Sequence, residues 1–144
     1  MTPLQFAKRM DEVAKNVEKT IGKAIVSSTL KGFEELAART PVDVGTAVSN
    51  WKVSLNEPAK GVRKAYSPGR AGSTAESNAS AAVVAASRAL GRYSEGDIIY
   101  ITNNVPYMER LNDGYSLQAP AGFVESALSS IRARIRAAKI VVTF

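Results

Sequence analysis

The chain has no cysteine and no histidine among its 144 residues. Disulfides, thiolate metal sites and nucleophile systems that depend on Cys or on a His base are therefore excluded. The absence of cysteine also fits a reducing cytoplasm. No apolar run approaches the roughly 18 residues that a membrane-spanning helix needs. Charged residues interrupt the first apolar stretch, so we expect neither a signal peptide nor a membrane protein.

The composition indicates one globular domain spanning residues 1–144. Hydrophobic residues make up 45% of the chain and charged residues 22%, close to the average of folded proteins. The 19 Lys and Arg residues outnumber the 13 Asp and Glu residues, which gives a net charge of +6. This excess favours a polyanionic partner, although solvated protein surfaces are often basic as well.

The beginning of the chain predicts one long helix, at about 3–40. Thr2 and Gln5 have the spacing of a capping box, and Pro41 disfavours helical geometry at the residue before it. Apolar residues recur at steps of three and four, which places them on one helix face. They include Phe6, Met10, Val13, Val17, Ile21, Ala24, Phe33 and Leu36.

Such a helix is longer than a small domain is wide, because it spans on the order of 55 Å at 1.5 Å per residue. Two alternatives follow from this length. The helix either bends around its own core, at Gly22 or Gly32, or it extends beyond its domain and packs on a neighbouring subunit.

Residues 42–45 predict a turn that leads into a strand at about 49–55. The side chain of Asp43 is able to accept hydrogen bonds from backbone amides two residues further on, and Gly45 tolerates a positive φ. Apolar residues alternate with polar ones in the strand. Trp51, the single tryptophan, is expected in the core, with a subunit interface as the alternative.

Residues 56–74 predict a long basic loop, with three glycines, two prolines and no apolar periodicity. Loops of this length in compact domains are usually functional or disordered. Two interpretations stay open: a solvated surface, or a loop that contacts a polyanion or a protein partner. The basic residues of the loop, which face Glu57 as their one acidic neighbour, are Lys60, Arg63, Lys64 and Arg70.

The second half of the chain predicts a helix at about 76–90, a strand at about 97–103 and a helix at about 121–138. Ser73 and Glu76 have the spacing of a second capping box at the start of the first of these helices. We expect the two predicted strands of the chain to share a sheet.

The last helix has an apolar face and a basic stripe, formed by Arg132, Arg136 and Lys139. The stripe is either a solvent-facing helix edge or a surface that faces DNA or a partner. A short helix ended by Gly114 precedes it. The ending KIVVTF predicts a terminal strand at about 139–144, in its own sheet or on the edge of a neighbour's.

Catalytic patterns are weak in this sequence. A metal-dependent nuclease would need acids that converge from separate elements, such as Asp43, Asp97 and Asp113, but no spacing favours their convergence. The glycine-rich segment SPGRAGST has no lysine at the phosphate-binding position. We therefore expect a protein that is not an enzyme and that holds no metal and no cofactor, with the nuclease kept as an alternative.

Two segments, TPVDVGTAVSNWKVSL and IIYITNNVPYMERLNDGYSLQAPAGFVESAL, follow the long helix. In this order and spacing the chain resembles the tail-completion or neck proteins of tailed bacteriophages, of the minor tail protein Z type, a head–tail joining family. The matching positions are Thr40, Pro41, Val42, Asp43, Gly45 and Trp51 in the first segment, and Asn103, Asn104, Pro106, Tyr107, Gly114, Ser116, Gln118, Ala119, Pro120 and Gly122 in the second. The chain departs from the pattern at Val44, where threonine is usual, and at Val48, where a basic residue is common.

The resemblance implies an α+β subunit, with a long N-terminal helix and a C-terminal helix packed on a small, mainly antiparallel β-sheet. It implies a homo-oligomeric ring in the neck of the virion, with six subunits favoured, assembled in the host cytoplasm. The ring would join the head connector or adaptor to the tail terminator, around the channel that genomic double-stranded DNA crosses. The turn after the long helix would fix the angle between helix and sheet in every subunit.

Within this ring we expect apolar helix and edge-strand surfaces to join the subunits. The basic residues would face DNA or acidic neighbouring rings, namely Lys60, Arg63, Lys64, Arg70, Arg132 and Arg136. The alternative function is a free DNA-binding protein without sequence preference, which grips the duplex through the same basic loop and helix stripe.

Overall fold

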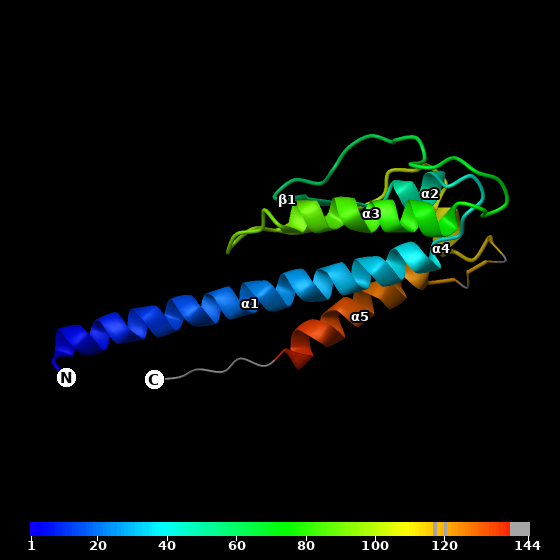
Figure 1. Ribbon diagram of the computed structural model, residues 1–144. Helices are drawn as coiled ribbons and strands as arrows, with labels where there is room; N and C mark the ends of the chain where they lie inside the picture. The colour runs from blue at the N-terminus through cyan, green and yellow to red at the C-terminus, as the bar shows by residue number, and fades with distance from the viewer. Residues whose placement is uncertain (117, 120, 139–144) are drawn as a thin grey trace.

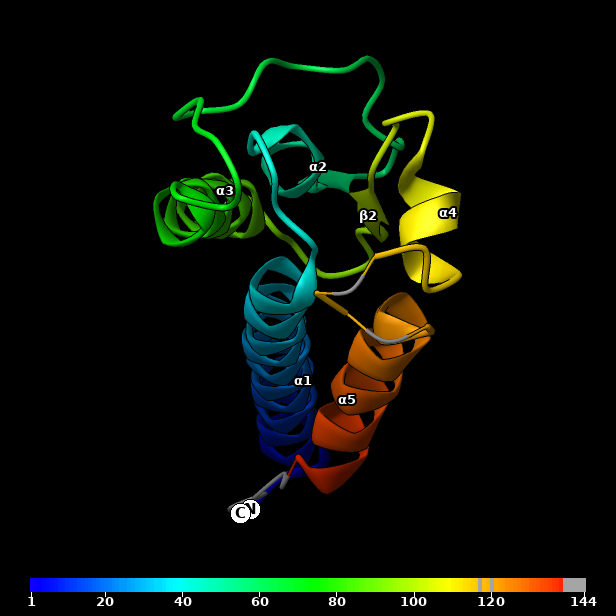
Figure 2. The same cartoon turned by 90° about the vertical axis from the view of Figure 1, so that its right-hand side faces the viewer.

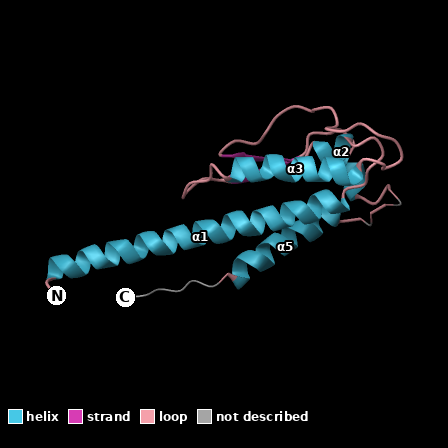
Figure 3. Ribbon diagram, viewed as in Figure 1, coloured by secondary structure: helices cyan, strands magenta, loops and turns pink. Residues whose placement is uncertain are grey.

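The computed structural model describes residues 1–116, 118–119 and 121–138. Its fold is α+β and mainly helical, with a single small sheet in the described residues (Figures 1 and 3). The elements in chain order are α1 (Pro3–Arg39), α2 (Thr46–Ser49), β1 (Lys52–Leu55), α3 (Ala75–Leu90), β2 (Ile99–Thr102), α4 (Met108–Asn112) and α5 (Phe123–Ala137). The fold class predicted from the sequence is therefore confirmed.

Helix α1 begins and ends where its sequence signals predict. The Thr2 hydroxyl accepts a hydrogen bond from the Gln5 amide, and the Gln5 side chain accepts one from the Thr2 amide, which completes the capping box. At the other end Thr40 is extended, as a residue before proline should be. Its hydroxyl donates to the Leu36 carbonyl and so satisfies one of the last helical acceptors.

The first half of α1 extends beyond the other elements, without a bend at either glycine (Figure 1). We call residues 3–21 the overhang. Phe6 is 56% and Ile21 40% exposed there, whereas Val13 and Val17 on the same face are partly buried. The helix therefore extends beyond its domain and does not bend around the core, and its packing on a neighbouring subunit stays a prediction.

The predicted strand 49–55 is wrong in its first part. Residues Thr46–Ser49 form the helical turn α2, and β1 begins only at Lys52. The reason is a local hydrogen bond, because the Asn50 side-chain amide donates to the Thr46 carbonyl at 2.7 Å and so caps the helical turn. Trp51 therefore precedes the strand.

β1 and β2 pair antiparallel, with Lys52 opposite Thr102 and Leu55 opposite Ile99. The prediction that the two strands share a sheet is confirmed, although β2 is shorter than the predicted 97–103. β1 lies against α3, which itself packs on α1, and α5 packs along a different side of α1 (Figure 2).

The predicted helices of the second half are confirmed, with each end within two residues of its predicted position. The capping box at the start of α3 is wrong, however. Thr74 takes the N-cap position without a side-chain bond, and the Ser73 hydroxyl accepts instead from the Arg70 amide, inside the preceding turn. The predicted terminal strand 139–144 lies outside the described residues.

The hydrophobic core joins the C-terminal half of α1 to the shorter elements. Phe33 and Val48 are fully buried at its centre, with Trp51 6% exposed beside them. Gly32 lies where α1 meets α5, and a side chain there would collide with Ile131. Among the described helices, none is both long and apolar enough to cross a membrane.

Candidate functional site

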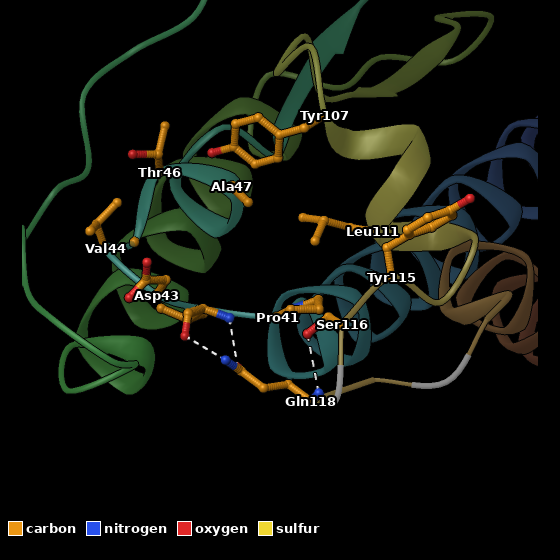
Figure 4. A pocket seen from close by; sticks show the side chains of 12 residues that line it. Pro41, Asp43, Val44, Thr46, Ala47, Tyr107, Leu111, Tyr115, Ser116 and Gln118 are labelled. Atoms are coloured by element: carbon orange, nitrogen blue, oxygen red, sulfur yellow. Dashed lines mark hydrogen bonds between the residues drawn. The ribbon is translucent and has the colours of Figure 1, made fainter.

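The two sequence segments that carry the family resemblance meet in space through Gln118. Its carbonyl oxygen accepts from the Val42 amide at 2.8 Å, and its amide group donates to the Val42 carbonyl at 2.8 Å (Figure 4). Val42 is 76 residues away in the sequence and is buried. The Gln118 side chain therefore binds both backbone groups of Val42, as a neighbouring strand would in a sheet. It fixes the end of α1 to the segment that leads into α5.

Asn50 and Asn78 bind two other distant backbones in the same way. Asn50 accepts from the Arg63 amide at 2.8 Å and donates to the Arg63 carbonyl at 2.9 Å. Asn78 accepts from the Ser67 amide at 2.7 Å and donates to the Ser67 carbonyl at 2.8 Å. We call these three side chains, Gln118, Asn50 and Asn78, the carboxamide clips.

The two asparagine clips hold the basic loop, residues 56–74, to the domain. Both asparagine side chains are fully buried. The Ser49 hydroxyl donates to the Asn78 carbonyl oxygen and accepts from the Tyr66 amide, which adds a further link to the loop. Buried polar groups of this kind are stabilising only when they are paired, as they are here. The loop is therefore a positioned element despite its lack of helix and strand.

Asn50 and Asn78 were not predicted from the sequence as residues of the site. A signal for Asn50 was present, because an asparagine within a predicted strand is disfavoured and needs a reason. Asn78 lies in a helix, where an asparagine is also less favourable than its alanine neighbours.

The side chain of Asp43 was predicted to bind backbone amides within its own turn, and this is wrong. It instead binds the basic loop. Its carboxylate accepts from the Ala71 amide at 3.0 Å, and its backbone carbonyl accepts from the Gly72 amide at 2.9 Å. The predicted positive φ at Gly45 is confirmed, at 95°. A Cβ at Gly45 would also collide with the Asn78 amide, so the turn and the clip are fitted to each other.

A groove of about 510 Å³ opens between the two segments, and we call it the motif groove. Two tyrosines on its far side are exposed to solvent, Tyr107 at 43% and Tyr115 at 79% (Figure 4). Such a lining of aromatic and small apolar groups with few polar ones suits binding of a chain segment. The groove is lined by Pro41, Val42, Asp43, Val44, Gly45, Thr46, Ala47, Tyr107, Leu111, Tyr115, Ser116 and Gln118.

Several other residues that carry the resemblance lie in the core or at turns and helix ends. The Trp51 indole N–H donates to the Thr40 hydroxyl at 2.8 Å, inside the core. Pro106 is exposed ahead of α4. Gly114 and Gly122 adopt positive φ angles of 89° and 81°, and Gly122 is the N-cap of α5. Pro120 lies outside the described residues.

The six predicted basic residues do not form one surface. Lys60, Arg63, Lys64 and Arg70 are exposed on the basic loop, and Arg132 and Arg136 are exposed on α5. The loop and α5 lie on opposite sides of α1, as both Figures 1 and 2 show. Lys139, the third residue of the predicted stripe, lies outside the described residues.

Some of the cations at the basic loop are held by contacts within the protein. The Arg63 guanidinium stacks on the Tyr66 ring, 3.3 Å from its centroid, and donates to the Lys64 carbonyl. A cation that the sequence analysis overlooked, Lys52, donates to the Lys60 carbonyl at 3.2 Å and so supports the loop from β1.

On α5 the sequence analysis overlooked Arg134, which forms an ion pair with Glu35 of α1 at 3.1 Å. The hydrogen bonds from Arg134 and Ser130 hold the pKa of Glu35 below its usual value. Arg39 adds a second link by donating to the Ser126 hydroxyl at 2.8 Å. Arg134 therefore fastens α5 to α1, while the neighbouring Arg132 and Arg136 remain exposed.

The acidic residues of the nuclease alternative serve separate local structures. Asp43 holds the basic loop, and Asp97 accepts from the Asn56 side chain and from the Ser94 amide, which lower the pKa of Asp97. Asp113 caps α4. Within the described residues no three acidic side chains lie close enough together to hold a metal ion, so these three do not converge.

The chain was compared with protein-family models, with curated proteins and with solved structures. None matches significantly. The function must therefore be argued from the sequence pattern and from the geometry described above.

Proposed function

We propose that this chain is a structural subunit of a ring in the neck of a tailed bacteriophage, which joins the head connector to the tail and surrounds the DNA channel. The observation that carries the proposal is the overhang, which places exposed apolar residues on a rigid helix outside the domain. An exposed apolar helix face of this kind is typical of a surface that contacts another protein, which supports the proposal. The sequence resemblance to neck proteins supports the kind of assembly.

The carboxamide clips suit the demands of such a ring. A closed ring with heterologous contacts requires the same angle between the two contact surfaces in every subunit. Gln118 fixes α1 to the segment before α5, and Asn78 fixes the basic loop to α3. Paired hydrogen bonds to the amide and the carbonyl of one residue leave little freedom in these angles.

The other surfaces fit the partners that the resemblance implies. The motif groove would receive a segment of the connector or of the tail terminator. One of the two basic surfaces would line the channel, where weak and salt-sensitive contacts to phosphate guide DNA without reading its bases. The opposite basic surface would then face an acidic neighbouring ring.

The test is the mass of the purified protein by light scattering, over a range of protein and salt concentrations, with and without duplex DNA. We expect a ring-sized species, or a monomer that ignores DNA and forms rings when purified tails are added. A monomer or dimer that binds duplex DNA tightly at low salt would contradict the proposal.

The second candidate is a free DNA-binding protein without sequence preference. The exposed Lys60, Lys64 and Arg70 favour it, because they lie on one loop that the clips hold in place. Under this alternative the affinity for DNA belongs to the free protein and falls steeply with salt. The same scattering experiment separates the two functions.

A further inference from the structure

The overhang presents its apolar residues as one stripe. Phe6, Met10, Val13, Val17 and Ile21 follow each other at steps of three and four residues, so they lie on the same face of α1. Phe6 is 56% exposed and Met10 37% exposed. Burial of either side chain would contribute favourably to the free energy of an assembly. Phe6, Met10 and Ile21 therefore leave apolar surface that the described residues do not bury, whereas Val13 and Val17 are partly buried.

A second groove, of about 630 Å³, lies between α3 and the C-terminal half of α1. We call it the α1–α3 groove. Its floor consists mainly of small side chains, which let another helix approach closely, and Val84 on its rim is 50% exposed. Its charged residues are both acidic. The lining residues are Glu34, Ala37, Ala38, Ala75, Glu76, Ala79, Ser80, Val83 and Val84.

The stripe and the groove complement each other in size and shape. The overhang brings large side chains, Phe6 and Met10 among them, to a floor of alanines, which is how helices interdigitate. The groove is lined by α3 from Ala75 to Val84, which is about 15 Å at 1.5 Å per residue, and the overhang is about 28 Å long. The overhang is therefore long enough to fill the groove along its whole length.

Their charges complement each other as well. Residues 1–24 contain five basic and three acidic residues, with Arg9 beside the stripe. The α1–α3 groove carries Glu34 and Glu76 and no basic residue in its lining. Opposite charges at the rim of a contact favour the correct partner and orientation.

We propose that the overhang of one copy of this chain docks in the α1–α3 groove of the next copy. The inference rests on the proposed function, since it specifies how neighbouring subunits of the ring are joined. Because the two surfaces differ, the contact is heterologous, and repetition of the same rotation closes a ring. Each subunit donates one helix and receives another.

The absence of cysteine makes a direct test possible. One variant carries Met10→Cys on the stripe, and a second carries Val84→Cys on the groove rim. When the two purified proteins are mixed and mildly oxidised, we expect a disulfide-linked dimer that joins position 10 of one chain to position 84 of the other. Light scattering on the unoxidised mixture gives the assembly state in parallel.

Matched controls carry the cysteine on the opposite faces of the same helices. Lys15→Cys lies on the overhang away from the stripe, and Ala85→Cys lies on α3 next to Val84 but directed away from the groove. We expect at least a tenfold lower yield of linked dimer when either control replaces its partner.

The outcomes separate this inference from the proposed function. Rings that form while position 10 links mainly to position 10, or while the controls link equally well, overturn the docking and leave the ring in place. A chain that stays monomeric and unlinked, also when purified tails are added, overturns both.

Discussion

Carboxamide side chains determine much of this fold at the scale of single residues. Gln118, Asn50 and Asn78 each satisfy both the amide and the carbonyl of a distant residue. A shorter or apolar side chain at these positions leaves two backbone groups without partners, which costs more than a typical hydrogen bond contributes.

Replacement of Gln118 tests the link between the two sequence segments. Gln118→Ala removes both hydrogen bonds to the buried Val42, so we expect the free energy of unfolding to fall by about 1–3 kcal/mol. Urea denaturation measures it. The control is Gln5→Ala, at the other glutamine, where only the exposed end of the overhang frays and the change should stay below about 0.5 kcal/mol. Equal losses in the two variants would contradict the assigned role.

Alanine substitutions at two glycines with similar backbone angles distinguish the cost of backbone strain from the cost of a steric clash. Gly45 and Gly61 have φ angles of 95° and 80°, so alanine costs about 1–2 kcal/mol at either position. A Cβ at Gly45 also collides with the Asn78 amide, whereas nothing lies near one at Gly61. We expect Gly45→Ala to destabilise the protein by at least about 1 kcal/mol more than Gly61→Ala in thermal unfolding. If Gly45→Ala destabilised the protein no more than Gly61→Ala, the Asn78 side chain would not lie against Gly45 as described.

At the scale of elements, the packing of α5 on α1 combines an apolar contact with a charged one. Gly32 allows Ile131 to approach the helix backbone, and Glu35 receives hydrogen bonds from Ser130 and Arg134. The charged contact makes the packing of these two helices dependent on pH.

Acid should weaken this packing through Glu35. Its pKa in the folded protein is lower than the ordinary value of 4.5, so its stabilising contribution is complete above that value and is lost as the pH falls through the folded pKa. We expect Glu35→Gln to lower the free energy of unfolding at pH 7 and to have a smaller effect at pH 3, below the ordinary pKa of 4.5. Glu34→Gln, whose partner Lys31 lies 3.7 Å away on the exposed surface, is the control and should show little effect at either pH. An unchanged effect of Glu35→Gln between the two pH values would refute the prediction.

The elements were predictable from the sequence to the extent that their causes are local. The capping box at Thr2, the proline after Thr40 and the regular apolar spacing fixed α1 within a residue or two. The strand 49–55 was wrong because Asn50 holds a helical turn through contacts with both Thr46 and the distant Arg63. The hydrogen bond between Asn50 and Arg63 joins residues 13 positions apart, and apolar periodicity in the sequence does not predict such a bond.

For the candidate site, the sequence predicted the residues better than their arrangement. Pro41, Asp43, Tyr107 and Gln118 do line one groove, but Asp43 binds the Ala71 amide and not its own turn. The basic residues were predicted as exposed and charged, and charge patterns alone did not reveal that the loop and α5 lie on opposite sides of α1.

At the scale of the whole molecule, assembly and folding should respond to different residues. Phe6 and Met10 are exposed on the overhang, away from the core. We expect Phe6→Asp with Met10→Asp to abolish the ring-sized species in light scattering and to change the free energy of unfolding of the monomer by less than about 0.5 kcal/mol. Lys8→Gln with Lys15→Gln, on the opposite face, is the control, because it lowers the charge of the overhang by the same two units and leaves the stripe intact. An unchanged ring in the double variant of the stripe would exclude it from the subunit contact.

The separation of the two basic surfaces makes a further prediction for DNA. If the basic loop binds the duplex, replacing Lys60, Lys64 and Arg70 with glutamine should reduce the slope of log affinity against log salt by about 0.9 for each phosphate that is no longer neutralised. The change of Arg132 and Arg136 to glutamine should then leave the slope unaltered. Fluorescence anisotropy with a labelled duplex measures both, and the reverse result would assign DNA binding to α5.

The buried position of Trp51 has an optical consequence. As the single tryptophan, with its indole N–H bonded to Thr40, it emits from the joint between α1 and β1 alone. Circular dichroism instead averages over all helices, to which the solvent-exposed overhang contributes a large share. On heating, ellipticity should begin to fall before the fluorescence changes, because the overhang melts first. The two signals together therefore distinguish fraying of the overhang from opening of the joint, without any added label.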